Sequence, residues 1–444
     1  MGTPSNVLDY ADQAVFLAEQ ATGTTNLLQC VWMYDRPVDA EALGRFHRNL
    51  ASGRLSRRIE RSAIPFGRHR WVSAADTAEL EISPARPRAD VEGWLAEQSR
   101  TRLDCVDGPG WHLALLPLSD GGAALSLVIS HCLTDGVGLC MAIAEAASGA
   151  GAGVAWPPAR SRSRCAAVRE DLGRSARDLP AVGRGLRAAV AMARRGSGKP
   201  KTTPASLEYP HERLTLPTAT AVVDAAEWDA AVERLGGTGN ALVAGLAADL
   251  GRRLGRVHPA DGTVSLSLPV ADRAEDETRA NAVSSIDVVV DPTGAATDLR
   301  KIRAAIKAAL THSDDVRDER WEVIPLIPLI SRRAFRRMLA AATGQAGSIV
   351  SSNLGDVEAT VNRPDGKDAD HFVMRPLYPG VTREVMHKAD GVLAIGSGRI
   401  NGEVFLVFLS YQPGRNNSDH ELRQTVSELL ADFSLTWSTP WPAA

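Results

Sequence analysis

The residues from Ala123 to Gly136 read AALSLVISHCLTDG and carry most of the information about the fold. The first eight, Ala123–Ser130, are almost continuously apolar and predict a buried β-strand. The apolar run Val137–Ala147 predicts a helix directly afterwards. His131 is the first residue after the strand, where rigid structure can hold a side chain that still reaches a cleft.

The residues of this loop allow two interpretations. In one, His131 is a catalytic imidazole, and Asp135 orients the loop by accepting from backbone amides or by pairing with a cation. Gly136 then permits a sharp reversal where a Cβ would clash. In the other, His131 is a buried histidine with satisfied nitrogens and Asp135 is only the N-cap of the next helix.

Strands and helices alternate on both sides of this loop, which predicts an α/β fold. The turn Ser-Asp-Gly-Gly separates two apolar runs, Trp111–Leu118 and Ala123–Ser130, and this pattern strongly indicates a β-hairpin. Thr238 and Asn240 are candidate caps for a buried helix. The other predicted strands are residues 27–34, 219–223, 264–270, 284–290, 348–352, 392–395 and 404–411, and the other predicted helices are residues 9–21, 39–50, 225–235, 240–254, 297–310 and 419–433.

The segment Ser130-His131-Cys132-Leu133-Thr134-Asp135-Gly136 resembles the H-H-x-x-x-D-G motif of acyltransferases related to chloramphenicol acetyltransferase. That superfamily includes condensation domains of nonribosomal peptide synthetases and bacterial wax ester synthase/diacylglycerol acyltransferases, and the wax-synthase branch looks closest. Further segments resemble that branch in the same order along the chain: Leu8-Asp9, Phe16–Glu19, Arg57–Ile59, Pro65–Val72, Leu103–Trp111, Leu268–Arg273, Asn281–Ser284 and Ser352–Gly355.

The resemblance implies two chloramphenicol-acetyltransferase-like subdomains, each a mixed sheet with flanking helices, which meet at a central tunnel. We expect the N-terminal subdomain, with the motif, over residues 1–158 and the C-terminal one over residues 216–444. Residues 159–215 are the expected connector. Donor and acceptor would enter the tunnel from opposite faces.

The resemblance also implies the roles of single residues. His131 would be the general base, because a neutral imidazole can take a proton from an incoming hydroxyl or amine. Asp135 would be structural and would pair with Arg273 from the other half. Ser352 and Asn353 are candidate donors in the tunnel near the thioester, and a turn cap at a strand end is the alternative for them.

The implied reaction is transfer of an acyl group from coenzyme A or an acyl carrier protein to a small-molecule alcohol or amine, with no cofactor. Three departures from the family pattern stand against a typical member. Ser130 replaces the first histidine, Asn240 is followed by alanine instead of aspartate, and Leu354-Gly355 replaces Pro-Gly. The first and the third of these departures motivate the alternative of a non-catalytic relative that binds an acyl chain, a carrier or a partner.

Composition excludes several other classes of protein. Among 444 residues, 50 basic and 53 acidic side chains give a net charge of −3, whereas a nucleic-acid-binding protein is normally far more basic. Five scattered cysteines without a C-x-x-C pair argue against disulfides and thiolate metal sites. With no signal-like N-terminus and no long apolar run, we expect a cytoplasmic protein.

One segment departs from this balance of charge. Residues 160–201 contain twelve basic and three acidic side chains. The simpler interpretation is a solvated helix and connector between the two halves. The alternative is a surface for a phosphorylated ligand, an acidic carrier or anionic lipid headgroups, with peripheral membrane contact.

Overall fold

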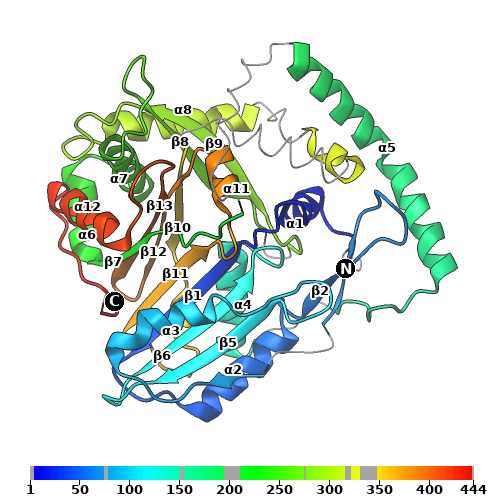
Figure 1. The fold of residues 1–444 in the computed structure, drawn as a ribbon, viewed down its shortest axis with the longest axis horizontal. Coiled ribbons are helices and arrows are strands. Elements are labelled where there is room, and N and C mark those ends of the chain that lie inside the picture. Colours follow the sequence, from blue (N-terminus) through cyan, green and yellow to red (C-terminus); the bar gives the residue numbers. More distant parts are fainter. Residues whose placement is uncertain are drawn as a thin grey trace.

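The computed structural model describes residues 5–74, 79–150, 155–194, 211–274, 277–315, 322–330 and 348–442. These residues form two lobes, each with its own β-sheet and its own hydrophobic core (Figure 1). The fold therefore confirms the predicted α/β class with two mixed-sheet subdomains. Residues 195–201 of the basic segment lie outside the described residues.

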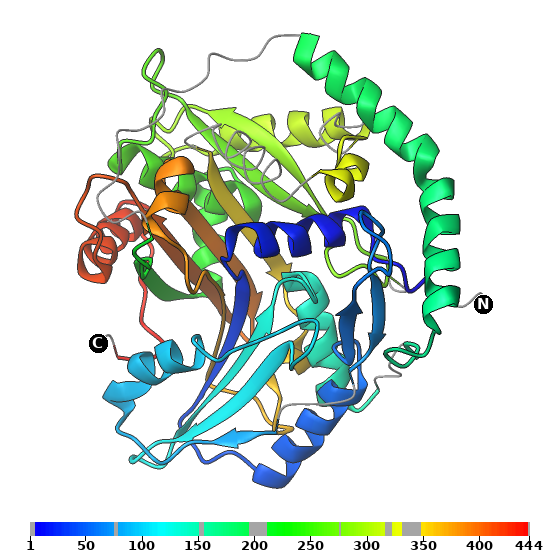
Figure 2. The same cartoon turned by 45° about the vertical axis from the view of Figure 1, so that its right-hand side comes forward.

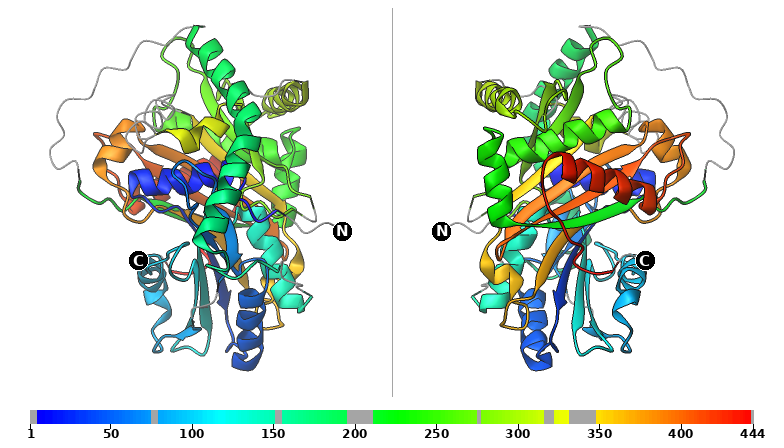
Figure 3. Two further views of the ribbon diagram at one scale, coloured as in Figure 1. Left: turned by 90° about the vertical axis from the view of Figure 1, so that its right-hand side faces the viewer. Right: turned by 90° about the vertical axis from the view of Figure 1, so that its left-hand side faces the viewer.

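The first lobe contains a sheet of five strands in the order β11-β1-β6-β5-β4. The bounds of these strands are β11 (His371–Leu377), β1 (Leu27–Tyr34), β6 (Ala123–Ser130), β5 (Trp111–Pro117) and β4 (Glu81–Ile82). Every residue of β1 and β6 is buried, because helices cover both faces of the sheet. Helix α3 (Val91–Gln98) lies on one face, and α2 (Ala40–Ser52) and α4 (Gly136–Ser148) lie on the other (Figure 3).

The second lobe contains a sheet of six strands in the order β7-β13-β12-β10-β8-β9. Its strands are β7 (Thr218–Asp224), β13 (Glu403–Tyr411), β12 (Val392–Ile400), β10 (Ile349–Asp356), β8 (Val264–Ala271) and β9 (Val283–Val290). Strand β10 is parallel to both of its neighbours, and the other pairs are antiparallel. The helices of this lobe that pack near the sheet are α6 (Ala225–Arg234), α7 (Gly239–Arg253), α8 (Arg300–Asp315) and α12 (Asp419–Asp432).

Strand β11 joins the two lobes. Although it belongs to the second half of the sequence, it pairs antiparallel with β1 at the edge of the first sheet, with Met374 opposite Cys30. The sequence predicted no strand here. Part of the expected C-terminal subdomain, residues 216–444, therefore completes the sheet of the first lobe.

The remaining elements lie around these sheets. They are helix α1 (Tyr10–Thr22), the antiparallel hairpin β2 (Arg57–Glu60) and β3 (Arg70–Ser73), helix α5 (Arg164–Arg194), helix α11 (Arg383–Lys388) and the 3-10 turns Arg88–Asp90, Ile324–Leu329 and Ala359–Asn362. Helix α5 runs along the outside of the molecule (Figure 2). None of the helices in the described ranges is long and apolar enough to cross a membrane.

Local signals explain several of these boundaries. Strands β5 and β6 form the predicted hairpin, with Pro117 opposite Ala123. Thr238 caps α7, as predicted, by accepting from the backbone N–H of Ala241 at 3.2 Å. The expectation that Asn240 is a cap is wrong, because it lies inside the first turn of α7.

Candidate active site

The motif loop leaves the end of β6 and enters α4 within five residues. Backbone hydrogen bonds hold its start: the N–H of His131 donates to the carbonyl of Asn26 at 2.9 Å, and that of Ser130 donates to Gly110 at 3.0 Å. The hydroxyl of Ser130 accepts from the N–H of Cys132 at 3.2 Å. Ser130 therefore shapes the loop locally, and the backbone at the start of the motif is held by the residues just before β1 and β5.

The imidazole of His131 is not the fully satisfied histidine of the alternative interpretation. Its Nδ1 atom is buried and has no hydrogen-bond partner among the described residues, while the residue as a whole keeps some exposed surface. Burial lowers the pKa of His131 below its ordinary value, and its own carbonyl, Asp135 and Asn281 oppose that shift. A ring with a lowered pKa is neutral at pH 7 and has a lone pair that can accept a proton.

Asp135 is both a helix N-cap and an ion-pair partner, because its two oxygens bind different groups. Oδ1 accepts from the backbone N–H of Gly138 at 2.7 Å and caps α4. Oδ2 accepts from Nη2 of Arg273 at 2.7 Å and from the N–H of Ala282 at 2.8 Å. The expected ion pair is therefore present, and it joins the motif to the loop between β8 and β9 of the second lobe.

Two glycines, one at the end of the motif and one two residues after it, lie close to parts of the second half. A Cβ at Gly136 would lie 3.0 Å from the side chain of Leu354, and Gly136 has no positive φ. The backbone conformation at Gly136 therefore does not need glycine, whereas a Cβ there would crowd Leu354, and its role in a sharp reversal stays a prediction. At Gly138, which the sequence did not single out, a Cβ would lie 3.0 Å from Cζ of Arg273.

A second buried carboxylate, Asp12 of α1, holds the same loop of the second lobe. It accepts from the backbone N–H groups of Ala280 at 2.9 Å and Asn281 at 2.8 Å, and from the side chain of Asn281 at 3.2 Å. That side chain also donates to the carbonyl of His131 at 3.2 Å. Burial raises the pKa of Asp12 to about 6, opposed by these donors and by Arg57. Sequence analysis missed Asp12, although it lies between two segments that carry the resemblance.

Arg57 is a third buried link between the motif and the second lobe. Its guanidinium donates to the carbonyls of Leu133 and Thr278, both at 2.6 Å. Its Cζ atom also lies 4.2 Å from the ring centroid of Trp71, and the aromatic face attracts the positive charge in this cation–π contact. Burial lowers the pKa of Arg57 to about 10, so the side chain stays charged at pH 7.

The strand end of β10 contains Ser352 and Asn353. The side chain of Asn353 accepts from the N–H of Gly355 at 3.0 Å and donates to Oδ1 of Asn240 at 2.6 Å. The carbonyl of Ser352 accepts from Ser397 at 3.3 Å. Among the described residues, no hydrogen bond links either side chain to His131. These contacts support the turn-cap interpretation of Asn353, and the substrate-binding role of both residues stays a prediction.

The thiol of Cys132 does not suit a nucleophile. The neighbouring Cys105 and burial raise its pKa well above the ordinary value, and Sγ donates to Oε2 of Glu19 at 3.3 Å. A protonated thiol is a poor nucleophile. The thiol of Cys132 is therefore not a competing candidate to His131.

Solved structures with this fold were found by comparison of the coordinates. The first condensation domain of the CDA synthetase matches with a TM-score of 0.60 and 17% identity over 99% of this chain and 100% of that one. The wax ester synthase/diacylglycerol acyltransferase from Marinobacter aquaeolei VT8 matches with a TM-score of 0.56 and 15% identity over 96% and 98%. Polyketide synthase associated protein 5 from Mycobacterium tuberculosis matches with a TM-score of 0.55 and 14% identity over 97% and 99%.

No protein-family profile matches the chain, and no curated protein matches it by sequence. The structural matches cover nearly the whole of both chains, so they concern the complete two-lobed arrangement and not one lobe. They include a condensation domain and a wax ester synthase alike, and the narrower likeness to the wax-synthase branch rests on the sequence motifs. The chain therefore shares its two-lobed fold with these condensation-domain and wax ester synthase structures.

Proposed function

We propose that the protein is an acyltransferase that moves an acyl group from a coenzyme A or carrier-protein thioester to a hydroxyl or amine acceptor. The observation that carries this proposal is His131, which keeps exposed surface and a lowered pKa between segments of both lobes. Support also comes from the names of the structural neighbours, which include condensation domains and a wax ester synthase. The central tunnel and the opposite entry of the two substrates stay predictions.

The proposed reaction uses His131 first as a base and then as an acid. Nε2 accepts the proton of the acceptor hydroxyl or amine while its oxygen or nitrogen bonds to the thioester carbonyl carbon. The tetrahedral intermediate then collapses, the carbon–sulfur bond breaks, and the imidazolium returns the proton to the leaving thiolate. The products are an ester or amide and a free thiol, so no oxidant or reductant is needed.

His131 also meets the structural requirement for a general base. Its own carbonyl, Asp135 and Asn281 act to raise its pKa against the larger effect of burial, and the proposed reaction needs the lone pair on Nε2. The hydrogen bonds of its backbone to Asn26 and Asn281 hold the main chain from which the ring extends. Acid–base catalysis by a positioned group contributes typically about 10²–10⁴-fold.

Replacement of this imidazole tests the proposal. His131→Ala should lower kcat/KM by at least about 100-fold in an assay of thiol release from acyl thioesters with an alcohol or amine present. The melting midpoint should stay near the wild-type value, because the hydrogen bonds of His131 to Asn26 and Asn281 are made by its backbone, which alanine retains. His420→Ala is a matched control, since His420 is exposed on α12.

Two results would contradict the proposal. Wild-type turnover by His131→Ala would remove the imidazole from the mechanism. Absence of thiol release by the wild-type protein, with a broad panel of thioesters and acceptors, would instead favour the non-catalytic alternative.

We further propose that α5 makes peripheral contact with an anionic membrane surface. Five of the eleven large apolar side chains that are exposed in the described part of the chain lie on this helix. Leu172, Leu179 and Leu186 are 55%, 63% and 59% exposed, and their spacing of seven residues places them on one face. Exposed arginines, among them Arg169 and Arg187, accompany them, a combination typical of helices at a lipid interface.

A further inference from the structure

The loop between β2 and β3 presents an aromatic ring to solvent from a strained backbone. Phe66 is 59% exposed, and its φ is 65°. Of the five non-glycine residues with positive φ in the described part of the chain, Phe66 alone is apolar. A bulky residue adopts this left-handed conformation only where the surrounding structure enforces it. The protein therefore holds the ring in water against both the hydrophobic effect and the preference of the backbone.

Contacts at the base of the loop enforce this conformation. The side chain of Gln13 donates to the carbonyl of Gly67 at 3.2 Å and accepts from the N–H of His69 at 2.9 Å. Nδ1 of His69 accepts from the N–H of Ser62 at 3.2 Å, and burial lowers the pKa of His69 to about 4, so this nitrogen is unprotonated at pH 7. A Cβ at Gly67 would lie 2.1 Å from Oγ of Ser62, which shows how tightly the loop closes on itself.

Helix α5 holds the same loop from the side. Oδ2 of the buried Asp171 accepts from the hydroxyl of Ser62 at 2.9 Å and from the N–H of Ala63 at 2.8 Å. Further along the helix, Asp178 pairs with Arg68 at 3.5 Å. The loop is thus fixed to the face of α5 that carries its aspartates.

The exposed apolar side chains of α5 lie beside this contact. At about 100° per residue, all five project within roughly 40° of one another, at about 60–100° around the helix axis from Asp171. They are Val168, Leu172, Leu179, Leu186 and Val190. The exposed Arg169 and Arg187 follow at about 160°, on the side of the stripe away from the loop. A flat surface that rests on this stripe therefore runs alongside the loop and meets arginines on its other side.

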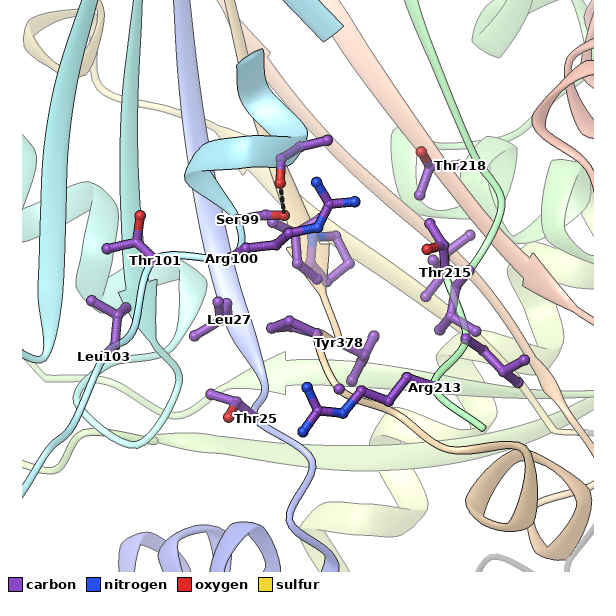
Figure 4. A pocket seen from close by; sticks show the side chains of 18 of the residues that line it. Thr25, Leu27, Ser99, Arg100, Thr101, Leu103, Arg213, Thr215, Thr218 and Tyr378 are labelled. Atoms are coloured by element: carbon purple, nitrogen blue, oxygen red, sulfur yellow. Dashed lines mark hydrogen bonds between the residues drawn. The ribbon is translucent and has the colours of Figure 1, made fainter. Parts of the chain in front are cut away.

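The chemistry of the loop suits a lipid interface. Pro65 and Phe66 are both exposed at its tip, and the exposed Arg61 adds positive charge at its base. Aromatic rings favour the boundary between headgroups and acyl chains, and arginines are attracted to anionic headgroups. The pocket of about 630 Å³ in Figure 4 lies elsewhere, between the start of β1 and the end of β11, and its lining includes no residue of the loop. The ring of Phe66 therefore does not serve that pocket.

We infer that Phe66 is a second membrane anchor, which inserts into the interface of an anionic bilayer beside the leucines of α5. The inference rests on the peripheral contact proposed above for α5 and adds an independent element to it. Because the loop is already fixed, little conformational entropy is lost when the ring inserts. A helix alone leaves the protein free to roll about the helix axis on the surface, whereas a helix and a loop together set one orientation.

Phe66→Gly tests this inference, because glycine removes the ring and also suits a positive φ. The affinity for phosphatidylglycerol vesicles at low salt should fall at least about tenfold, while the melting midpoint should equal or exceed the wild-type value. A merely structural role of the ring would give the opposite pattern, a lower melting midpoint with unchanged binding. Ile82→Ser is the matched control, because Ile82 is also 59% exposed but lies on β4, so it should bind like the wild-type protein.

Insertion itself is measured with Phe66→Trp and Ile82→Trp in phosphatidylglycerol vesicles that contain brominated acyl chains. Bromine quenches an indole that enters the acyl region, and the nine native tryptophans set the background. Quenching of Phe66→Trp should exceed that of the wild-type protein, and quenching of Ile82→Trp should equal it. Equal quenching of all three proteins would overturn the insertion of the loop.

The loop and α5 can fail separately. Wild-type binding by Phe66→Gly, with lost binding by Leu172→Ser/Leu179→Ser/Leu186→Ser, would overturn the second anchor and leave the contact through α5 intact. Reduced binding by Phe66→Gly, with wild-type binding by the triple variant, would support the loop and overturn α5. No binding of the wild-type protein to anionic vesicles would overturn both, and a dimer that Phe66→Gly converts to a monomer would then assign the ring to a contact between protein chains.

Discussion

At the scale of single residues, Asp135 shows why sequence alone left two interpretations open. One carboxylate oxygen caps α4 and the other binds Arg273, so the local and the long-range partner do not compete. The local partner follows from the spacing of the motif. The long-range partner lies 138 residues away and entered only through the resemblance to a family. Gly138 was missed because its function depends on where Arg273 lies in space.

Asp135→Ala should destabilise the protein more than it changes the chemistry. The ion pair is buried, with 3% and 6% side-chain exposure for Asp135 and Arg273. Removal of the carboxylate leaves the guanidinium without its charge partner, at a cost of about 3–5 kcal/mol. Loss of the cap adds about 1 kcal/mol. Urea unfolding measures the sum.

A double-mutant cycle separates the pair from the cap. Asp135→Ala/Arg273→Ala should be less destabilised than the sum of the two single variants, because neither charge is then left alone. Full stability of Asp135→Ala, with slow turnover, would contradict the structural role and would place Asp135 in the reaction.

At the scale of elements, the sequence predicted most strands and helices because their apolar runs are long and end at clear turn residues. It failed at β11, where Arg375 and Pro376 interrupt the apolar pattern. The structure tolerates both: β11 is an edge strand, where proline is accepted, and Arg375 donates to Gln29 at 2.8 Å and Glu92 at 3.0 Å. Such partners, hundreds of residues away, leave no local signal.

Helix α5 yields a prediction about membranes. The wild-type protein should float with phosphatidylglycerol vesicles at low salt, and Leu172→Ser/Leu179→Ser/Leu186→Ser should stay in solution. Burial of each leucine in the lipid interface contributes about 1.5–3 kcal/mol, and each nearby arginine about 1 kcal/mol. Val289→Ser is the control, because Val289 is 59% exposed on β9, away from α5.

Vesicles of phosphatidylcholine alone should bind more weakly, since they lack the negative charge that arginines attract. Failure of the wild-type protein to bind anionic vesicles at low salt would contradict the proposal. A wild-type dimer that the triple substitution converts to a monomer, without vesicle binding, would identify the leucine face as a contact between protein chains instead.

At the scale of the whole molecule, two carboxylates from the first lobe hold one short loop of the second. Asp12 accepts from the backbone of Ala280 and Asn281, and Asp135 accepts from Ala282. The same loop contacts the carbonyl of His131 through Asn281. The catalytic candidate is therefore positioned by the junction of the lobes. The sequence could not predict these contacts, because nearly every residue has a backbone N–H group. A sequence pattern therefore does not show which of these groups bind a carboxylate.

This junction should make stability depend on pH in a way that Asp12 controls. Burial raises the pKa of Asp12 from 3.8 to about 6, against the opposing effects of its backbone donors and Arg57, and Asp9 adds to the increase. The folded protein thus binds the proton more tightly than the unfolded chain does. Between about pH 4 and pH 6 the unfolded chain has lost this proton, whereas the folded protein still holds it. The Asp12 contribution to the free energy of unfolding therefore falls as pH rises through this range, by about 3 kcal/mol in total.

This contribution is isolated by measuring the free energy of unfolding in urea for the wild-type protein and for Asp12→Asn at pH values from 4 to 7. Asparagine cannot titrate, so the wild-type advantage over the variant should be largest near pH 4 and should shrink up to pH 7. Burial raises the pKa of Asp171, but hydrogen bonds from Ala63 and Arg162 among others outweigh it and hold the pKa below its usual range. In an Asp171→Asn control, the wild-type advantage should therefore stay nearly constant from pH 4 to 7 and fall only at lower pH. A wild-type advantage that grows with pH at Asp12 would show that the backbone donors of the loop, and not burial, dominate this carboxylate. The clamp between the lobes would then be strongest with Asp12 charged, which in that case holds at all pH values above the ordinary pKa of 3.8.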